Sequence, residues 1–257
     1  MEEALIRERH GAVERIILNR AAQDNMLNDA FRTEMLRACD EITRDTDIHV
    51  VILTGCDGIF SRSSDWVEQN AKGYMESEEA FRGFLWNVRD VSIRMRSVPK
   101  PIIAAVNGVA TMGGFELALS CDFIVASSAA TMGDGHVSGV GGGGGSQRLM
   151  ELIGTRATRW MLYTGEVLSA ERAYELGIVQ QVYPSEIFEE SVLELAKEIA
   201  TRRLGRSLER IKALTAGSEP SLSSLNYEID HSIAHWLSRE ASAWRADFSA
   251  SGGNSGK

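Results

Sequence analysis

Short runs of β-branched residues alternate with amphipathic stretches along the first half of this chain, and this alternation limits the folds open to it. Two such runs are VERIILNR (13–20) and HVVILTG (49–55), and the stretch between them, residues 28–45, has apolar residues at helical spacing. The pattern recurs in KPIIAAVNG (100–108) and CDFIVASS (121–128). Strand, helix, strand units predict a parallel sheet with crossover helices, and therefore an α/β fold.

The second half of the chain is predicted to be largely helical. Residues 187–204 and 222–248 have the apolar periodicity of long amphipathic helices. We therefore predict a core with the active site over residues 1–190 and a helical region over residues 191–248. The last residues, 249–257, are small and polar and are predicted to be disordered.

Composition narrows the class of protein and its partners. The 257 residues carry a formal net charge of −9, which gives no general attraction for nucleic acid or an anionic membrane surface. The three cysteines lack the spacing of zinc sites or disulfide frameworks, and no run reaches the ~18 apolar residues of a membrane span. His231 and His235 lie four apart on a predicted helix without a visible third ligand, so no metal site is predicted. The chain is predicted to be cytoplasmic, with neither nucleic acid nor membrane as a partner.

Five consecutive glycines stand in MGDGHVSGVGGGGGSQRL, residues 132–149. A phosphate loop of the Walker A type is excluded because no Gly-Lys-Ser or Gly-Lys-Thr follows. A dinucleotide fingerprint is disfavoured because the run comes after about the fourth strand and lacks an acidic partner at the end of a next strand. A flexible linker fits poorly, since apolar spacing resumes at once. The run is predicted to be a close-packed pocket wall that leads into a helix.

Two loops that follow predicted strands have the residues of an oxyanion site. NGVATMGGFELALSCD (107–122) places Gly113 and Gly114 at the start of a helix, where backbone N–H groups lack intrahelical acceptors. DGIFSRSSD (57–65) is the second loop. N–H groups from two such loops, aimed at one oxygen, stabilise the charge of an enolate or tetrahedral intermediate. Glu116 would lie in the first turn of the same helix, within reach of that oxygen.

Four stretches together resemble the crotonase superfamily, also called enoyl-CoA hydratase/isomerase, over nearly the whole chain. They are ILNRAAQDNMLN, VVILTGCDGIFSRSSD, KPIIAAVNGVATMGGFELALSCDFIVAS and GGSQRLMELIGTRATRWMLYTGEVLSAERAYELGIVQQVYP. The resemblance implies a spiral of ββα units with a C-terminal helical trimerisation region, and a homotrimer or dimer of trimers. It also implies that Ser64 and Gly113 supply the oxyanion-hole N–H groups. The substrate would be an acyl-CoA thioester, with no further cofactor.

The catalytic residues depart from the family pattern at one position. The first of two family glutamates matches Glu116, whereas the second falls at or next to His136, with Asp134 close by. Histidine, with an ordinary pKa of about 6.5, can take over an acid or base role. Glu116, His136 and Asp134 are therefore the predicted catalytic residues.

The residues expected to contact the substrate also depart from the family. The usual AGAD of the oxyanion loop is SRSSD here, in which Arg62 could reach a carboxylate or phosphate. The lysines that usually contact the CoA phosphates in this family are absent here. Arg20 and Arg245 are the nearest cations to those positions. The predicted substrate-binding set is Arg62, Trp86, Gly141 and Gly142.

Two alternatives to an enoyl-CoA hydratase or isomerase stay open at this point. GDGHVSG resembles the corresponding segment of 6-oxocamphor hydrolase, a crotonase relative that cleaves a carbon–carbon bond of a cyclic β-diketone without CoA. The other alternative is a catalytically silent, oligomeric family member. CoA binding would separate the first alternative from a hydratase, and turnover would separate the second.

Overall fold

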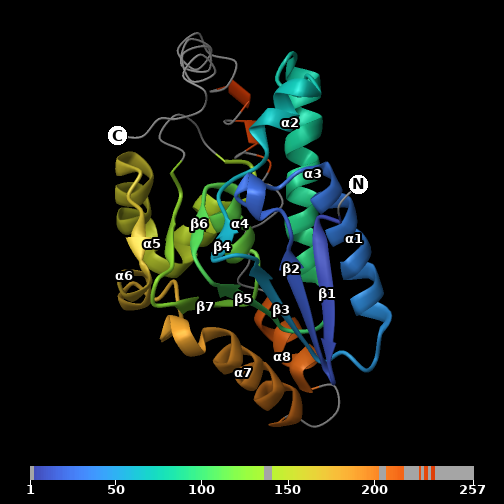
Figure 1. Cartoon of the computed structure of the whole chain (residues 1–257). Coiled ribbons are helices and arrows are strands. Elements are labelled where there is room, and N and C mark those ends of the chain that lie inside the picture. Colours follow the sequence, from blue (N-terminus) through green and yellow to red (C-terminus); the bar gives the residue numbers. More distant parts are fainter. Residues whose placement is uncertain are drawn as a thin grey trace.

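The frame of the molecule is a six-stranded sheet of order β1-β2-β3-β5-β7-β10 (Figure 1). The structure is a computed structural model, and it describes residues 3–135, 141–202, 207–216, 226, 229–230 and 233–234. β1 and β2 pair antiparallel, and every later neighbour pairs parallel. The strands are β1 (Leu5–His10), β2 (Val13–Leu18), β3 (Val50–Gly55), β5 (Ile102–Val106), β7 (Phe123–Ser127) and β10 (Gln181–Tyr183).

The central strands are buried on both faces of this sheet. All residues of β3 and β5 are buried, as expected for parallel strands that carry continuous apolar runs. One face packs against α1 (Asp29–Arg44) and α3 (Glu78–Ser97), and the other against α7 (Phe188–Arg202). The predicted α/β fold is confirmed. The predicted strand at 13–20 ends at Leu18, two residues early.

A second sheet of four short strands has the order β4-β6-β8-β9. β4, β6 and β8 each follow a strand of the large sheet and precede a helix, so three ββα turns succeed one another. This arrangement confirms the predicted spiral of ββα units. The elements are β4 (Ile59–Ser61), β6 (Val109–Thr111), β8 (Thr131–Gly133), β9 (Leu168–Ser169), α2 (Trp66–Ala71), α4 (Gly113–Leu119) and α5 (Gly145–Thr164).

Capping residues and glycines determine where the helices begin and bend. Asn28 caps α1 by accepting a hydrogen bond from the Phe31 N–H. α5 is interrupted at Gly154, whose φ of 75° is strained for other residues. Further helical elements of the described part of the chain are α6 (Ala170–Glu175), α8 (Ser207–Thr215) and 3-10 turns at Ala21–Gln23 and Ser185–Ile187.

The predicted C-terminal helices are described only in part. α7 corresponds to the helix expected over residues 187–204, and its buried side chains pack on the large sheet. The expected boundary between residues 190 and 191 falls inside this helix, and the division of the chain stays a prediction. Ile229 and Ile233 pack against aromatic residues of α3. Most of residues 222–248, and the tail 249–257, lie outside the described residues.

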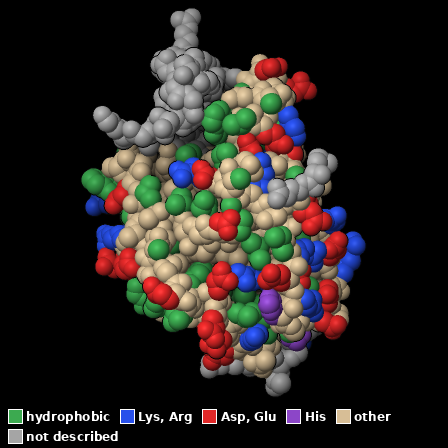
Figure 2. All heavy atoms as spheres, viewed as in Figure 1, with side chains coloured by type: hydrophobic (Ala, Val, Ile, Leu, Met, Phe, Trp, Pro, Cys, Tyr) green, Lys and Arg blue, Asp and Glu red, His purple; other side chains and the backbone are tan. Residues whose placement is uncertain are grey.

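Acidic and basic side chains are interspersed over the described part of the face shown in Figure 2. Side chains of opposite charge neighbour one another in several places on this face, and hydrophobic side chains lie among them. Within the described residues, no helix is long and apolar enough to cross a membrane.

Candidate active site

The loop that carries Ser64 is held by a backbone bridge to Leu27. The Leu27 N–H donates to the Ser63 carbonyl (2.9 Å), and the Asp65 N–H donates to the Leu27 carbonyl (3.0 Å). Successive backbone groups of an extended chain point in opposite directions, so the N–H of Ser64 faces away from Leu27. That direction leads to Gly113, because a Cβ atom built on Gly113 would lie 2.9 Å from the Ser64 nitrogen.

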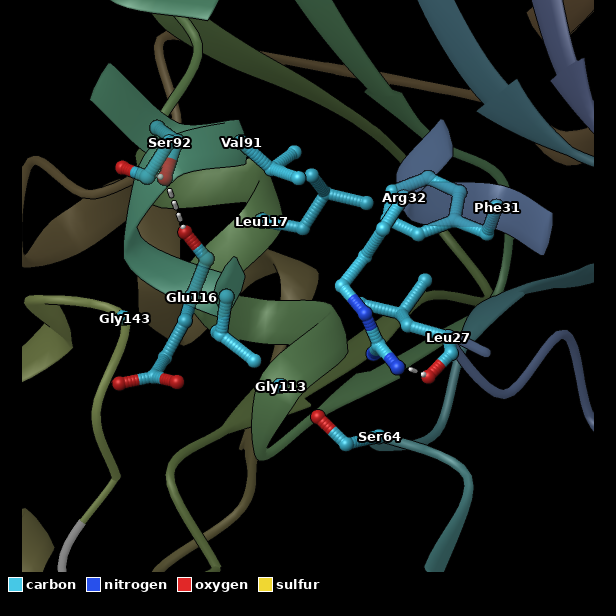
Figure 3. Close-up of a pocket in the computed structure, with 12 residues that line it drawn as sticks. Leu27, Phe31, Arg32, Ser64, Val91, Ser92, Gly113, Glu116, Leu117 and Gly143 are labelled. Carbon is cyan, nitrogen blue, oxygen red and sulfur yellow. Dashed lines mark hydrogen bonds between the residues drawn. The ribbon is translucent and has the colours of Figure 1, made fainter. Parts of the chain in front are cut away.

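Gly113 begins α4 directly after a sharp turn of the chain. Met112, the residue before it, has φ 48° and ψ −123°, a conformation that side-chain-bearing residues rarely adopt. The Met112 N–H donates to the Gly133 carbonyl (3.0 Å), and the Met112 carbonyl accepts from the Glu116 N–H (2.9 Å). The turn thereby places the start of α4, at Gly113, next to Ser64, as Figure 3 shows. Backbone segments from different turns of the spiral thus come together at Gly113 and Ser64.

Glu116 lies in the first turn of α4 and is only 6% exposed. The Gly145 N–H donates to its Oε1 atom (3.2 Å). Cβ atoms on Gly143 and Gly145 would lie within 2.9 Å of the Glu116 side chain, and one on Gly141 would overlap Oε1. The glycine run therefore encloses this carboxylate, which confirms the expected close-packed wall before a helix.

A small cavity joins these groups. It has a volume of about 30 Å³, which exceeds the roughly 10–15 Å³ that a cavity needs to hold a water molecule. Ser64, Gly113, Glu116 and Gly143 lie on its wall, together with apolar side chains of α1, α3 and α4. Backbone donors and a buried carboxylate at one cavity are what the stabilisation of an enolate and the activation of water require.

Two buried arginines belong to the surroundings of this cavity and were missed by sequence reasoning. Arg32 of α1 lines the cavity. Arg148 of α5 donates to the Gly143 carbonyl and to the Ser92 hydroxyl (both 2.5 Å). The Ser92 and Ser120 hydroxyls are 2.9 Å apart, and Ser120 donates to the Glu116 carbonyl (2.7 Å). A buried polar chain thus joins α3, α4 and α5 behind the carboxylate.

The sequence contains a signal for one of these arginines. Arg32 precedes Met35 by three residues and Cys39 by seven, so it lies on the apolar stripe of α1. A charged residue on such a stripe indicates a buried site. Arg148 has no comparable signal, because its partners come from distant parts of the chain.

The family model described as enoyl-CoA hydratase/isomerase matches residues 8–235. The chain belongs to this family. It is 35% identical over 198 residues to the 2,3-dehydroadipyl-CoA hydratase of Escherichia coli, with 76% of this chain and 75% of that protein covered. It is 36% identical over 203 residues to the short-chain-enoyl-CoA hydratase of Clostridium acetobutylicum, with 77% and 74% covered.

Solved structures of enoyl-CoA hydratases have the same fold. The enzyme from Bacillus anthracis superposes with a TM-score of 0.79 at 29% identity, covering 96% of both chains. An enoyl-CoA hydratase/isomerase from Xanthobacter autotrophicus gives a TM-score of 0.86 at 25% identity, covering 98% of this chain and 95% of that one. The protein is therefore a crotonase-superfamily enzyme of the hydratase type. The carbon–carbon bond hydrolase alternative has no support among these relatives.

The predicted catalytic residues of this hydratase-type enzyme are described unequally. Glu116 lines the same cavity as Ser64 and Gly113, and its catalytic role stays a prediction. Asp134 follows β8 and is buried. His136 lies outside the described residues, so its role stays a prediction.

The predicted substrate-binding residues fall into two groups. Gly141 contacts Glu116, and a Cβ atom on Gly142 would lie 2.6 Å from Leu85 of α3. Arg62 forms an ion pair with Asp24 (2.8 Å) and is about half exposed, whereas the Trp86 ring stacks on the Arg89 guanidinium at 3.3 Å. Within the described residues, neither Arg62 nor Trp86 is on the wall of the cavity. Their predicted roles would require substrate atoms outside it.

The groups considered for CoA phosphates and for metal are placed as follows. Arg20 pairs with Asp65 (3.0 Å) and donates to the Met26 carbonyl (2.6 Å). Arg245, His231 and His235 lie outside the described residues. Within the described part of the chain, no three His, Cys, Asp or Glu side chains are grouped to hold a metal ion.

Proposed function

We propose that this enzyme adds water across the double bond of a 2-enoyl-CoA thioester. The N–H groups of Ser64 and Gly113 would donate hydrogen bonds to the thioester oxygen, and Glu116 would hold the water. The observation that carries this assignment is that Ser64, Gly113 and Glu116 line one cavity, with the Gly113 backbone against the Ser64 nitrogen. The family membership of the chain supports it. The reaction uses no cofactor besides the CoA thioester, which is the substrate.

In the proposed step, the water oxygen forms a bond to the β-carbon while Glu116 takes one proton from the water. The electron pair of the double bond moves through the α-carbon onto the thioester oxygen, where two N–H donors stabilise the negative charge. The α-carbon then takes a proton as the carbonyl re-forms. His136 is the predicted second acid/base group for this transfer.

Glu116→Gln tests the assignment. The amide keeps the size of the side chain but cannot take a proton, so we expect kcat for crotonyl-CoA hydration to fall by about 10²- to 10⁴-fold. Loss of the conjugated enoyl absorbance measures the rate. Glu186→Gln, an exposed glutamate in a 3-10 turn, is the matched control and is expected to match the wild type.

Two outcomes would contradict the assignment. Wild-type rates in Glu116→Gln would remove that residue from the reaction. Calorimetry that detects no CoA or acetyl-CoA binding would argue against a CoA thioester as substrate. Turnover of a bicyclic β-diketone in place of crotonyl-CoA would instead favour the carbon–carbon bond hydrolase, and absence of any turnover would favour a silent family member.

We also propose a homotrimer or a dimer of trimers. Large apolar side chains of α5 and α6 are exposed in the single chain, with Trp160 63% and Tyr163 78% accessible. Exposed apolar patches of this kind commonly mark interfaces between subunits. Light scattering coupled to size exclusion gives the mass directly. A monomer at micromolar concentration would contradict this proposal, and the cytoplasmic location stays a separate prediction.

A further inference from the structure

Arg32 is a charged side chain buried in the wall of the candidate active site. It is 6% exposed and shares the cavity wall with Ser64, Gly113 and Glu116 (Figure 3). Burying a guanidinium is costly unless the group is paired and hydrogen-bonded. An apolar side chain at this position would complete the stripe of α1 without that cost. The arginine therefore needs an explanation from its contacts.

Neighbouring carboxylates balance the charge of Arg32. Its Nη2 donates to Asp29 and lies 3.9 Å from Glu68. Lys72 pairs with the same two carboxylates, at 3.1 Å from Glu68. Two cations thus face two anions, and the cluster has no net charge. Burial lowers the pKa of Arg32, and the Glu68 carboxylate opposes this effect.

The guanidinium of Arg32 keeps hydrogen-bonding capacity after these contacts. Of the five N–H donors of an arginine, one on Nη1 reaches the Leu27 carbonyl (3.3 Å) and one on Nη2 reaches Asp29. The Nε–H has no acceptor among the described residues. The guanidinium carbon lies over the Phe84 ring, 5.0 Å from the ring centre. Figure 3 shows the guanidinium directed toward Ser64.

We propose that Arg32 selects thioesters whose acyl chain carries an oxygen acceptor, by donating a hydrogen bond to that oxygen. This inference rests on the proposed enoyl-CoA hydration and names its substrate class. An all-hydrocarbon acyl chain against the guanidinium would exclude water and leave donors without acceptors, which is unfavourable. Because the cluster is neutral, a hydroxyl or carbonyl oxygen satisfies it without adding charge.

A matched set of five-carbon 2-enoyl-CoA thioesters tests the proposal. The terminal carbon is a methyl, a hydroxymethyl or a carboxylate, and kcat/KM is measured for each. In the wild type, we expect the hydroxymethyl substrate to exceed the methyl substrate by about 10- to 100-fold. Arg32→Met should remove this preference by lowering kcat/KM for the oxygenated substrate. Arg37→Met on the same helix, with a side chain 69% exposed, should keep it.

The outcomes separate this proposal from the proposed function. Hydration of all three substrates with no advantage for the oxygenated ones would overturn the role of Arg32 and leave the hydratase assignment intact. No hydration of any substrate would overturn both. Retention of the preference in Arg32→Met would also overturn the proposed role of Arg32. The ratio of kcat/KM for the hydroxymethyl and methyl substrates is measured on the wild type and does not depend on how a variant folds. Arg32→Lys keeps the positive charge but loses the planar set of guanidinium donors, so it should lower the preference. A carboxylate faster than the hydroxyl would identify an anionic oxygen, and the reverse order a neutral one; both support the proposal.

Discussion

The two sheets of this molecule differ in what holds them. The strands of the large sheet are buried on both faces, and their apolar runs are long enough to specify a strand. The small sheet consists of strands of two or three residues, and the pairing of β4 with β6 and of β6 with β8 brings together the loops that carry Ser64 and Gly113. The frame thus depends on apolar burial, whereas the site depends on how closely backbone segments approach. Changes to the frame should act on stability, and changes to the site on rate.

The largest expected effect comes from the large sheet. Leu53 of β3 is fully buried, and Leu53→Ala should lower the free energy of unfolding by about 2–5 kcal/mol. Denaturant unfolding measures the loss. The kcat of the remaining folded protein should stay near that of the wild type. Leu214→Ala on α8, where the side chain is 85% exposed, is the control and should change stability by less than about 0.5 kcal/mol.

A smaller change in the glycine run should have the opposite profile. A Cβ atom on Gly141 would overlap the Glu116 carboxylate, so Gly141→Ala should displace this group and lower kcat by about 100-fold. Gly83→Ala in α3 meets open space and should stabilise the protein by about 0.5–1 kcal/mol without changing kcat. Equal effects of the two substitutions on kcat would remove the distinction between frame and site.

The smallest effect concerns α1, which belongs to both regions. Asn28→Ala removes the side-chain acceptor of the Phe31 N–H (2.9 Å) and should cost about 1 kcal/mol of stability. Asn28→Asp, which keeps a cap, should retain most of it. Thermal unfolding measures both variants. A lower kcat of the folded Asn28→Ala variant, in addition to its lower stability, would show that the helix cap also affects the geometry of the site.

Sequence patterns predicted the frame better than the small sheet. The buried strands have apolar runs of four or five residues, and α1 has a clear helical period. β4, β6, β8 and β9 are too short to show any period, so only the family resemblance pointed to them. Their pairing depends on contacts between residues far apart in the chain, such as Ile59 with Val109.

The candidate site was predictable where its chemistry lies in local motifs. Gly113 and Glu116 share one helix start, and Ser64 stands in a loop that ends a strand. The contact of the glycine run with Glu116 could be anticipated only as close packing. The apolar stripe of α1 marks Arg32 as buried, but the sequence could not place Arg32 or Arg148 at the cavity, because the surrounding residues come from several turns of the spiral.

The bridge between Leu27 and Ser64 has a consequence for mutational drift. Both hydrogen bonds of the bridge, and the donor that Ser64 presents to the cavity, belong to the main chain. The side chains at Ser63 and Ser64 can therefore be exchanged over generations while the arrangement of donors is inherited unchanged. Gly113 has no such latitude, because any larger residue would contact the Ser64 nitrogen. Descendants of this enzyme should vary at the serines and keep the glycine.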